Sequence, residues 1–208
     1  MEKYILEVDE FLRSLKQNKH IGHSMLLGAG ASIESGVQSA YDCIWDWKRD
    51  IYISHNPSMA NVYKNIKLDS IRNAIQQWLD IQNSYPKRDF DEEYTFFAEK
   101  AYKIPSDRSQ YFRSIVDGKT PSLGYNLITF LNQRGMVKTV WTTNFDGLMV
   151  KACHQNNVTP IEITLESQDR IYRKDANNEL LCIALHGDYK YGSLKNTAEE
   201  LDGQSDKF

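Results

Sequence analysis

The spacing of apolar residues along the chain changes between a helical period and short continuous runs. Apolar side chains recur every three to four positions over residues 4–15, which predicts an opening helix that lies across a sheet. The next apolar run, residues 24–27, is short and passes directly into Gly-Ala-Gly-Ala-Ser at 28–32. A short apolar run that ends at glycines is typical of a buried strand that enters a tight loop. The chain therefore begins as an α/β fold would.

A long helical region follows the glycine loop. Over residues 39–133 the apolar positions keep the helical period, as at Ile44, Trp47 and Ile51, and no strong strand pattern interrupts them. We expect residues 45–120, approximately, to form a helical insertion, a smaller module beside a sheet. Its aromatic side chains are expected to pack between the helices, and they include Trp45, Trp47, Trp78, Phe96 and Phe97.

Strand patterns return in the last third of the chain. The runs 136–142, 160–165 and 179–185 predict strands, and residues 148–156 predict a helix. Because strands alternate with helices, we expect an α/β fold with a Rossmann-like parallel sheet flanked by helices. Ligands of such sheets bind beyond the carboxyl ends of the strands. Polar motifs follow three of the predicted strands, namely the glycine loop, the segment with Asn144 and Asp146, and the segment with His186.

The composition restricts the class of function. The 208 residues suit one domain, and 41% of them are hydrophobic. Lys and Arg total 25 against 28 for Asp and Glu, so the net charge of -3 gives this segment no footprint for direct nucleic-acid binding. No apolar run approaches about 20 residues and no signal peptide is evident, so we expect a cytoplasmic protein without a membrane span. The three cysteines form no CxxC pair, which argues against a metal site.

The glycine loop is a candidate for phosphate binding. Glycine at positions 28 and 30 lets the backbone turn tightly and approach a pyrophosphate, and the amides of a following helix would face its charge. A dehydrogenase fingerprint would need glycine where Ile33 stands, and a P-loop would need a Gly-Lys-Ser/Thr ending that the chain lacks. A plain turn from strand to helix stays open as an alternative.

His186, Asn144 and Asp146 are the candidate chemical groups at the other strand ends. His186 follows an apolar strand and precedes a glycine, a setting in which an imidazole can act as a general base near neutral pH. Asn144 and Asp146 can hydrogen-bond ribose hydroxyls, a carboxamide or a water, although both residue types are also common in turns. The other four histidines, expected to be structural, are His20, His23, His55 and His154.

Taken together, three segments resemble the sirtuin family in order and rough spacing. They are residues 28–32 together with 35–37, residues 142–148 with the sequence TTNFDGL, and residues 185–187 with the sequence LHG. The resemblance implies a Rossmann-like fold that binds NAD between the sheet and the smaller helical module. It also implies that Asn144 positions the ribose or the attacking water, that His186 accepts a proton, and that Asp146 holds the carboxamide. The residues that would seat the phosphates and the nearby ribose are Gly28, Ala29, Gly30 and Ser32.

Two departures from sirtuin deacylases change the expected reaction. Those enzymes continue the motif at Gly36 with Pro-Asp-Phe-Arg and carry a four-cysteine zinc module, whereas this chain has Gln-Ser-Ala-Tyr at 38–41 and no such module. Residues 39–50, and residues 185–191 with 194–197, resemble instead the bacterial antiphage sirtuin-like NADases, above all the sirtuin-like domains that accompany short prokaryotic Argonautes. In such systems a partner recognises invader nucleic acid, and NAD is then destroyed; we also expect oligomerisation on activation.

We therefore expect an NAD glycohydrolase that cleaves the nicotinamide–ribose bond to give nicotinamide and ADP-ribose, in defence by abortive infection. NAD is the expected substrate, without a metal, and the expected partner is a short Argonaute with guide nucleic acid or another phage-sensing module. Two alternatives stay open, a module that binds NAD or ADP-ribose without turnover and, less favoured, an NAD-dependent protein deacylase. Because the family has further strands after the catalytic histidine, we expect the fold to continue beyond Phe208.

Overall fold

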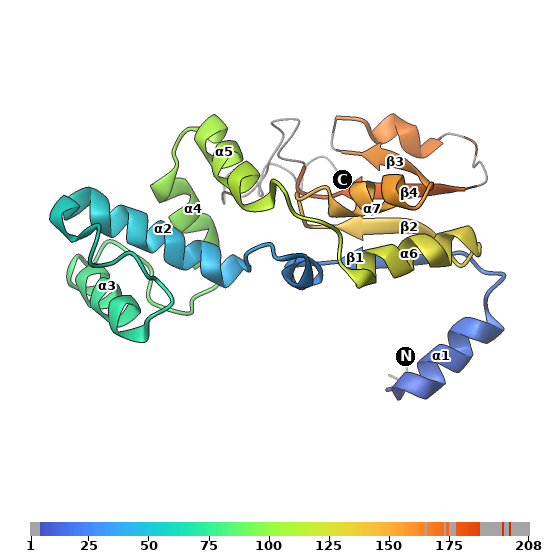
Figure 1. The fold of residues 1–208 in the computed structure, drawn as a ribbon, viewed down its shortest axis with the longest axis horizontal. Coiled ribbons are helices and arrows are strands. Elements are labelled where there is room, and N and C mark those ends of the chain that lie inside the picture. Colours follow the sequence, from blue (N-terminus) through green and yellow to red (C-terminus); the bar gives the residue numbers. More distant parts are fainter. Residues whose placement is uncertain are drawn as a thin grey trace.

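The fold is built on a four-stranded parallel sheet with helices packed against it (Figure 1). In the computed structural model the strand order is β1-β2-β4-β3, with β1 His23–Leu27, β2 Val137–Thr142, β3 Thr159–Ile163 and β4 Glu179–Ala184. All three neighbouring pairs are parallel, so the expected α/β class with a parallel sheet is confirmed. The structure describes residues 5–164, 166–172, 174, 178–187, 197 and 200, and residues 188–196 of the segment that resembles the antiphage NADases lie outside them.

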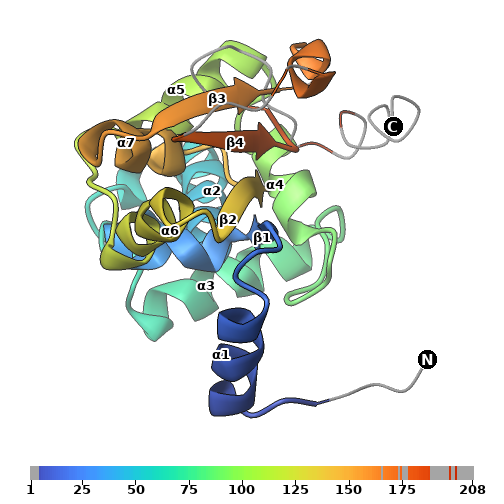
Figure 2. The same ribbon diagram turned by 90° about the vertical axis from the view of Figure 1, so that its right-hand side faces the viewer.

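The helices form two groups. The helices α6 and α7 pack against the sheet, whereas α2, α3, α4 and α5 gather beside it (Figures 1 and 2). The second set, α2 to α5, is called the helical group. Residues 39–133, which the structure describes in full, contain helices and no strand, as the sequence predicts. The helices are α1 Val8–Gln17, η1 Ala29–Ser35, α2 Ala40–His55, η2 Pro57–Met59, α3 Asp69–Ile81, α4 Glu93–Ala101, α5 Pro105–Val116, α6 Leu123–Gln133, α7 Leu148–Gln155 and η3 Gln168–Tyr172, where η marks a 3₁₀ helix.

Local hydrogen bonds set where the long helix α2 begins. The Ser39 hydroxyl accepts the Asp42 main-chain amide at 3.1 Å, and the Asp42 carboxylate in turn accepts the Ser39 main-chain amide at 3.4 Å. This reciprocal pairing satisfies groups that an α-helix leaves without partners at its N-terminus. It fixes the direction in which α2 leaves the glycine loop and enters the helical group.

The register of the strands brings three carboxyl ends to one edge of the sheet. Leu27, the last residue of β1, pairs with Thr142, the last residue of β2, and Thr142 pairs with Ala184 at the end of β4. The pairing continues one residue further, because the Thr143 amide donates to the Leu27 oxygen at 3.1 Å and the Leu185 amide donates to the Thr142 oxygen at 2.8 Å. The segments after β1, β2 and β4 therefore start side by side.

Two apolar cores stabilise the two groups of elements. One lies between the sheet and the helices α6 and α7 and includes the fully buried Val140. The other lies among α2, α3, α4 and α5 and includes Trp47, which is 1% exposed. Phe145, which follows β2, reaches the second core, where its ring centroid lies 4.2 Å from that of Phe112. The loop after β2 thus joins the sheet to the helical group.

The opening helix differs from its prediction. The helix α1 forms, but none of its residues is buried, and it projects away from the sheet rather than lying across it (Figures 1 and 2). Its apolar side chains are exposed, with Val8 71%, Phe11 52% and Leu12 54% accessible. The helical period predicted the element correctly and its packing incorrectly, because an apolar stripe does not specify the surface that covers it. Among the described residues, no helix has the length and apolar character needed to cross a membrane.

Candidate functional site

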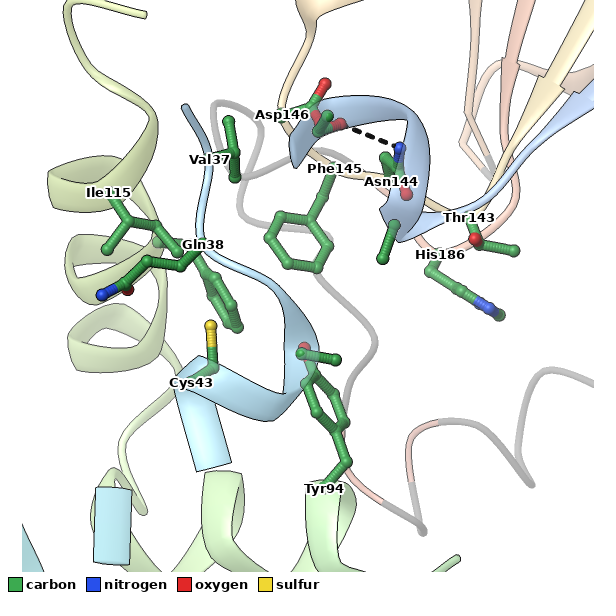
Figure 3. Close-up of a pocket in the computed structure, with 14 residues that line it drawn as sticks. Val37, Gln38, Cys43, Tyr94, Ile115, Thr143, Asn144, Phe145, Asp146 and His186 are labelled. Carbon is green, nitrogen blue, oxygen red and sulfur yellow. Dashed lines mark hydrogen bonds between the residues drawn. The ribbon is translucent and has the colours of Figure 1, made fainter. Parts of the chain in front are cut away.

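A cavity of about 340 Å³ lies where the three strand ends meet the helical group (Figure 3). This volume falls within the range of small-molecule sites. The sheet side of the cavity carries residues from all three predicted motifs, and the helical side carries mostly apolar ones. The predicted site residues that line it are Ala29, Ser32, Asn144, Asp146 and His186.

Asn144 holds the glycine loop against the end of β2. Its side-chain nitrogen donates to the main-chain oxygen of Gly28 at 2.9 Å and to the hydroxyl of Ser32 at 3.1 Å. A main-chain oxygen only accepts hydrogen bonds, so the nitrogen of the amide must face Gly28. Both hydrogens of the amide are then used, and the oxygen Oδ1 is the atom left to orient a ligand or a water.

The hydroxyl of Ser32 is the centre of a buried polar network. It donates to the carboxylate of Asp146 and lies 2.8 Å from the hydroxyl of Tyr125 on α6. Since a hydroxyl has one hydrogen and two acceptor positions, donation to Asp146 leaves it to accept from Tyr125 and Asn144. Ser32 is therefore saturated by the protein. Tyr125 could not be expected here from the sequence, because it lies on a predicted helix like any other aromatic residue.

Asp146 is 8% exposed, and both of its oxygens have protein partners. Oδ1 accepts the main-chain amide of Leu148 at 2.9 Å, at the start of α7, and Oδ2 accepts the hydroxyl of Ser32. Burial raises the pKa of the carboxyl, and the hydrogen bonds from Ser32 and Leu148 lower it in part. The carboxylate thus holds the loop and the start of α7, and each of its oxygens keeps one further acceptor position.

His186 follows β4 and lines the same cavity as Asn144. The turn that carries it is closed by Gly187, whose φ of +80° is a left-handed conformation that glycine adopts without strain. Figure 3 shows Thr143, Asn144 and His186 on one side of the cavity, with Cys43 and Tyr94 on the other. The structure therefore brings the two expected catalytic residues to one cavity.

The glycine loop differs in part from its prediction. Instead of an open loop before an α-helix, Ala29–Ser35 forms the 3₁₀ helix η1, and the Ala31 amide donates to the Gly28 oxygen at 3.0 Å. Gly30 lies away from the cavity and lines a separate hollow of about 270 Å³ that faces α6. At both Gly28 and Gly30 an added Cβ would meet no atom within 4 Å, so neighbouring atoms do not require glycine there. Of the two glycines, only Gly28 touches the network around Asn144.

The residues on the helical side of the cavity were not predicted from the sequence. This side consists mainly of apolar and aromatic side chains of α2, α4 and α5, and the ring of Phe145 packs against Phe112 among them. Burial raises the pKa of the Cys43 thiol to about 11, so this thiol is protonated at neutral pH and is a poor nucleophile. These residues look like core residues in the sequence, because helical spacing does not show which core faces a cavity. They are Cys43, Tyr94, Phe112 and Ile115.

Comparison with known proteins does not assign the chain to a family. The chain matches no protein-family model, and no curated protein sequence matches it. Within the part of the chain that the structure describes, no group of three His, Cys, Asp or Glu side chains is arranged to hold a metal ion. What is established is an α/β protein with a four-stranded parallel sheet, and a cavity where three strand ends meet the helical group.

Proposed function

We propose that this protein is an NAD glycohydrolase that cleaves the nicotinamide–ribose bond of NAD to give nicotinamide and ADP-ribose. The observation that carries the proposal is the meeting of Asn144, Ser32 and His186 at one cavity, each supplied by the segment after a different strand. Ligands of parallel α/β sheets bind at such edges. The cavity volume of about 340 Å³ suits the nicotinamide end of NAD rather than the whole dinucleotide.

The proposed reaction needs few groups from the protein. The bond between the ribose C1′ and the pyridinium nitrogen breaks, and its electron pair stays on nitrogen, so nicotinamide leaves as a neutral molecule. An oxocarbenium-like ribose forms, and a water attacks C1′ and loses a proton. The site therefore has to orient the ring and the water and accept one proton.

Asn144 and His186 take the two chemical roles in this proposal. The free acceptor Oδ1 of Asn144 orients the attacking water or a ribose hydroxyl, while its nitrogen keeps the glycine loop in place. His186, on the same wall of the cavity, accepts the proton that the water loses. Ser32 and Asp146 support the loop from behind, and in this proposal a remaining acceptor position of Asp146 holds the amide nitrogen of the carboxamide.

We assign the sheet to the Rossmann-like class and the helices α2 to α5 to a smaller module that closes over the nicotinamide. The pyrophosphate would lie near the open backbone at Gly28, where a side chain would meet no neighbouring atom. The proposed setting is antiphage defence, with a short Argonaute and its guide nucleic acid, or another phage-sensing module, as the activating partner.

The test is a turnover assay on the protein together with its candidate activating partner. Nicotinamide release from NAD is followed by chromatography for wild type, His186→Ala and Asn144→Ala. Loss of a general base costs about 100- to 10,000-fold, and the Asn144 variant is expected to lose at least as much. His154→Ala is the matched control, because His154 borders a different hollow beside α7.

The possible results separate the function classes. Release by Asn144→Ala at the wild-type rate would refute the proposed chemistry. Tight NAD binding without release under every activating condition would favour a sensor module instead. Release that requires an acyl-lysine peptide would favour a deacylase.

A further inference from the structure

Tyr94 presents a hydroxyl to the cavity from the helical side. It lies in the first turn of α4, and its ring packs edge-on against Trp47 with the centroids 5.1 Å apart. Figure 3 shows the side chain extending from α4 toward the wall that carries Phe145 and Asn144. Among the described residues the Tyr94 hydroxyl has no hydrogen-bond partner. A partly buried hydroxyl without a partner in a cavity wall is a group that a ligand can satisfy.

The direction of Tyr94 is fixed by the residue before it. Glu93 is 5% exposed and forms an ion pair with Lys48 on α2, which is 1% exposed. The second carboxylate oxygen of Glu93 accepts the Asp89 amide at 2.9 Å. The start of α4 is therefore tied both to α2 and to the turn that precedes it. Tyr94 is held by a rigid element, as a residue that selects a ligand should be.

On the opposite wall, the polar groups of Ser32, Asn144 and Asp146 offer no free donor to one part of the proposed substrate. The nicotinamide ring bears a carboxamide, whose oxygen needs a hydrogen-bond donor when it is buried. The hydrogen of Ser32 goes to Asp146, the hydrogens of the Asn144 amide go to Gly28 and Ser32, and the Asp146 carboxylate is an acceptor. A donor for the carboxamide oxygen has to come from elsewhere in the cavity wall.

We propose that the hydroxyl of Tyr94 donates a hydrogen bond to the carboxamide oxygen of nicotinamide, which makes Tyr94 a specificity-determining residue of the cavity. This inference rests on the proposed function, because it takes the nicotinamide end of NAD as the occupant. Burial raises the pKa of Tyr94, so the hydroxyl keeps its proton at neutral pH and stays a donor. The aromatic rings of Phe112 and Phe145 supply an apolar surface for the pyridine ring beside it.

The experiment compares two probes on two variants by calorimetry. The probes are carbocyclic NAD, in which a methylene replaces the ring oxygen of the nicotinamide-side ribose so that the bond resists cleavage, and ADP-ribose, which lacks nicotinamide. Tyr94→Phe removes the hydroxyl and keeps the ring that packs on Trp47. Tyr85→Phe is the matched control, because Tyr85 belongs to the same aromatic core, stacks on Phe97 and does not line the cavity.

Because Tyr94→Phe lacks one hydrogen bond to the ligand, we expect it to bind carbocyclic NAD about 3- to 10-fold more weakly than wild type does. Binding of ADP-ribose by Tyr94→Phe, and of both probes by Tyr85→Phe, should stay within about twofold of wild type. Unchanged binding of carbocyclic NAD, or equal weakening of both probes, overturns the role of Tyr94 while the proposed function stands. If the wild-type protein binds neither probe, both the inference and the proposed function fail.

Discussion

The side-chain nitrogen of Asn144 donates to the main-chain oxygen of Gly28 across 2.9 Å, although the two residues are 116 positions apart in the chain. The same nitrogen donates to the hydroxyl of Ser32 at 3.1 Å. Asn144 therefore closes the cavity by tying the segment after β2 to the segment after β1. A residue at this position contributes to stability as well as to any chemistry, and the two contributions can be measured separately.

Replacement of Asn144 by aspartate should destabilise the protein. The variant keeps the size of the side chain but places a carboxylate oxygen against the Gly28 oxygen and removes both hydrogens of the amide. A buried polar group without its partner costs about 1–3 kcal/mol, so we expect the free energy of unfolding to fall by that amount. Urea unfolding measures it. Asn65→Asp is the control, since Asn65 is exposed and its Oδ1 accepts the Lys67 amide, which an aspartate also does. If Asn144→Asp and Asn65→Asp had the same free energy of unfolding, the hydrogen bonds from Asn144 to Gly28 and Ser32 would not stabilise the protein.

The buried carboxyl of Asp146 predicts a pH dependence of stability. Burial raises its pKa in the folded state, so the folded protein holds this proton more tightly than the unfolded chain does. The contribution to stability is therefore fully present below the pKa of an ordinary aspartate, about 4, and is lost as the pH rises through the raised pKa. Asp146→Asn removes this titration. The free energy of unfolding of wild type minus that of Asp146→Asn should decrease as the pH increases from about 4.

Urea unfolding of both proteins over a pH series measures this difference. Asp91→Asn serves as the control, because the side chain of Asp91 is exposed and the substitution should leave the pH dependence of wild type intact. If the difference between wild type and Asp146→Asn grew with pH, the hydrogen bonds from Ser32 and Leu148 would outweigh burial, and the pKa of Asp146 would be lowered rather than raised by folding.

The parts of the fold that follow from local pattern were predictable. The apolar runs predicted all four strands, and the alternation of strands and helices predicted a parallel sheet. The rule that parallel strands share a carboxyl edge then predicted that Ser32, Asn144 and His186 line one cavity. This prediction does not depend on side-chain contacts, because the register of the sheet alone brings the ends of β1, β2 and β4 to one edge.

The remaining features depend on tertiary contacts that a sequence pattern does not encode. Tyr94 and Tyr125 lie on helices with ordinary apolar spacing, and only the packing of those helices shows that their hydroxyls face the cavity or the Ser32 network. Gly30 looks equivalent to Gly28, yet η1 turns it toward α6. Asp146 looks like a free ligand, yet the loop itself uses both of its oxygens.

The buried ion pair between Lys48 and Glu93 should be necessary for the stability of the helical group. Lys48 also donates to the Gln76 side chain at 2.9 Å, and its Nζ lies 4.6 Å from the centroid of the Trp45 ring. Removal of one partner leaves a buried charge uncompensated, so Glu93→Gln should lower the free energy of unfolding by about 3–5 kcal/mol. The double variant Lys48→Met/Glu93→Gln removes both charges and should recover part of this loss. Urea unfolding of the two variants measures both effects.

The exposed pair of Arg113 and Asp117 is the control for this prediction. Its atoms are 4.0 Å apart and its side chains are 66% and 63% exposed, so Asp117→Asn should change stability by less than about 0.5 kcal/mol. A loss of similar size in Glu93→Gln and Asp117→Asn would mean that burial of the first pair has no energetic consequence.

Gly28→Ala should separate ligand binding from folding. The φ of Gly28 is −103°, which alanine adopts easily, and a Cβ there would meet no atom within 4 Å. Alanine restricts the unfolded chain, so stability should stay level or rise by up to about 1 kcal/mol. A pyrophosphate seated against this backbone would meet the new methyl group, and binding of ADP-ribose should weaken about tenfold or more. Calorimetry and urea unfolding on one preparation test both parts.

Gly36→Ala should behave in the opposite way, since the φ of +79° at Gly36 predicts a loss of about 1–2 kcal/mol without a direct effect on the ligand. If a stable Gly28→Ala protein bound ADP-ribose with the affinity of wild type, the proposed position of the pyrophosphate beside Gly28 would be wrong.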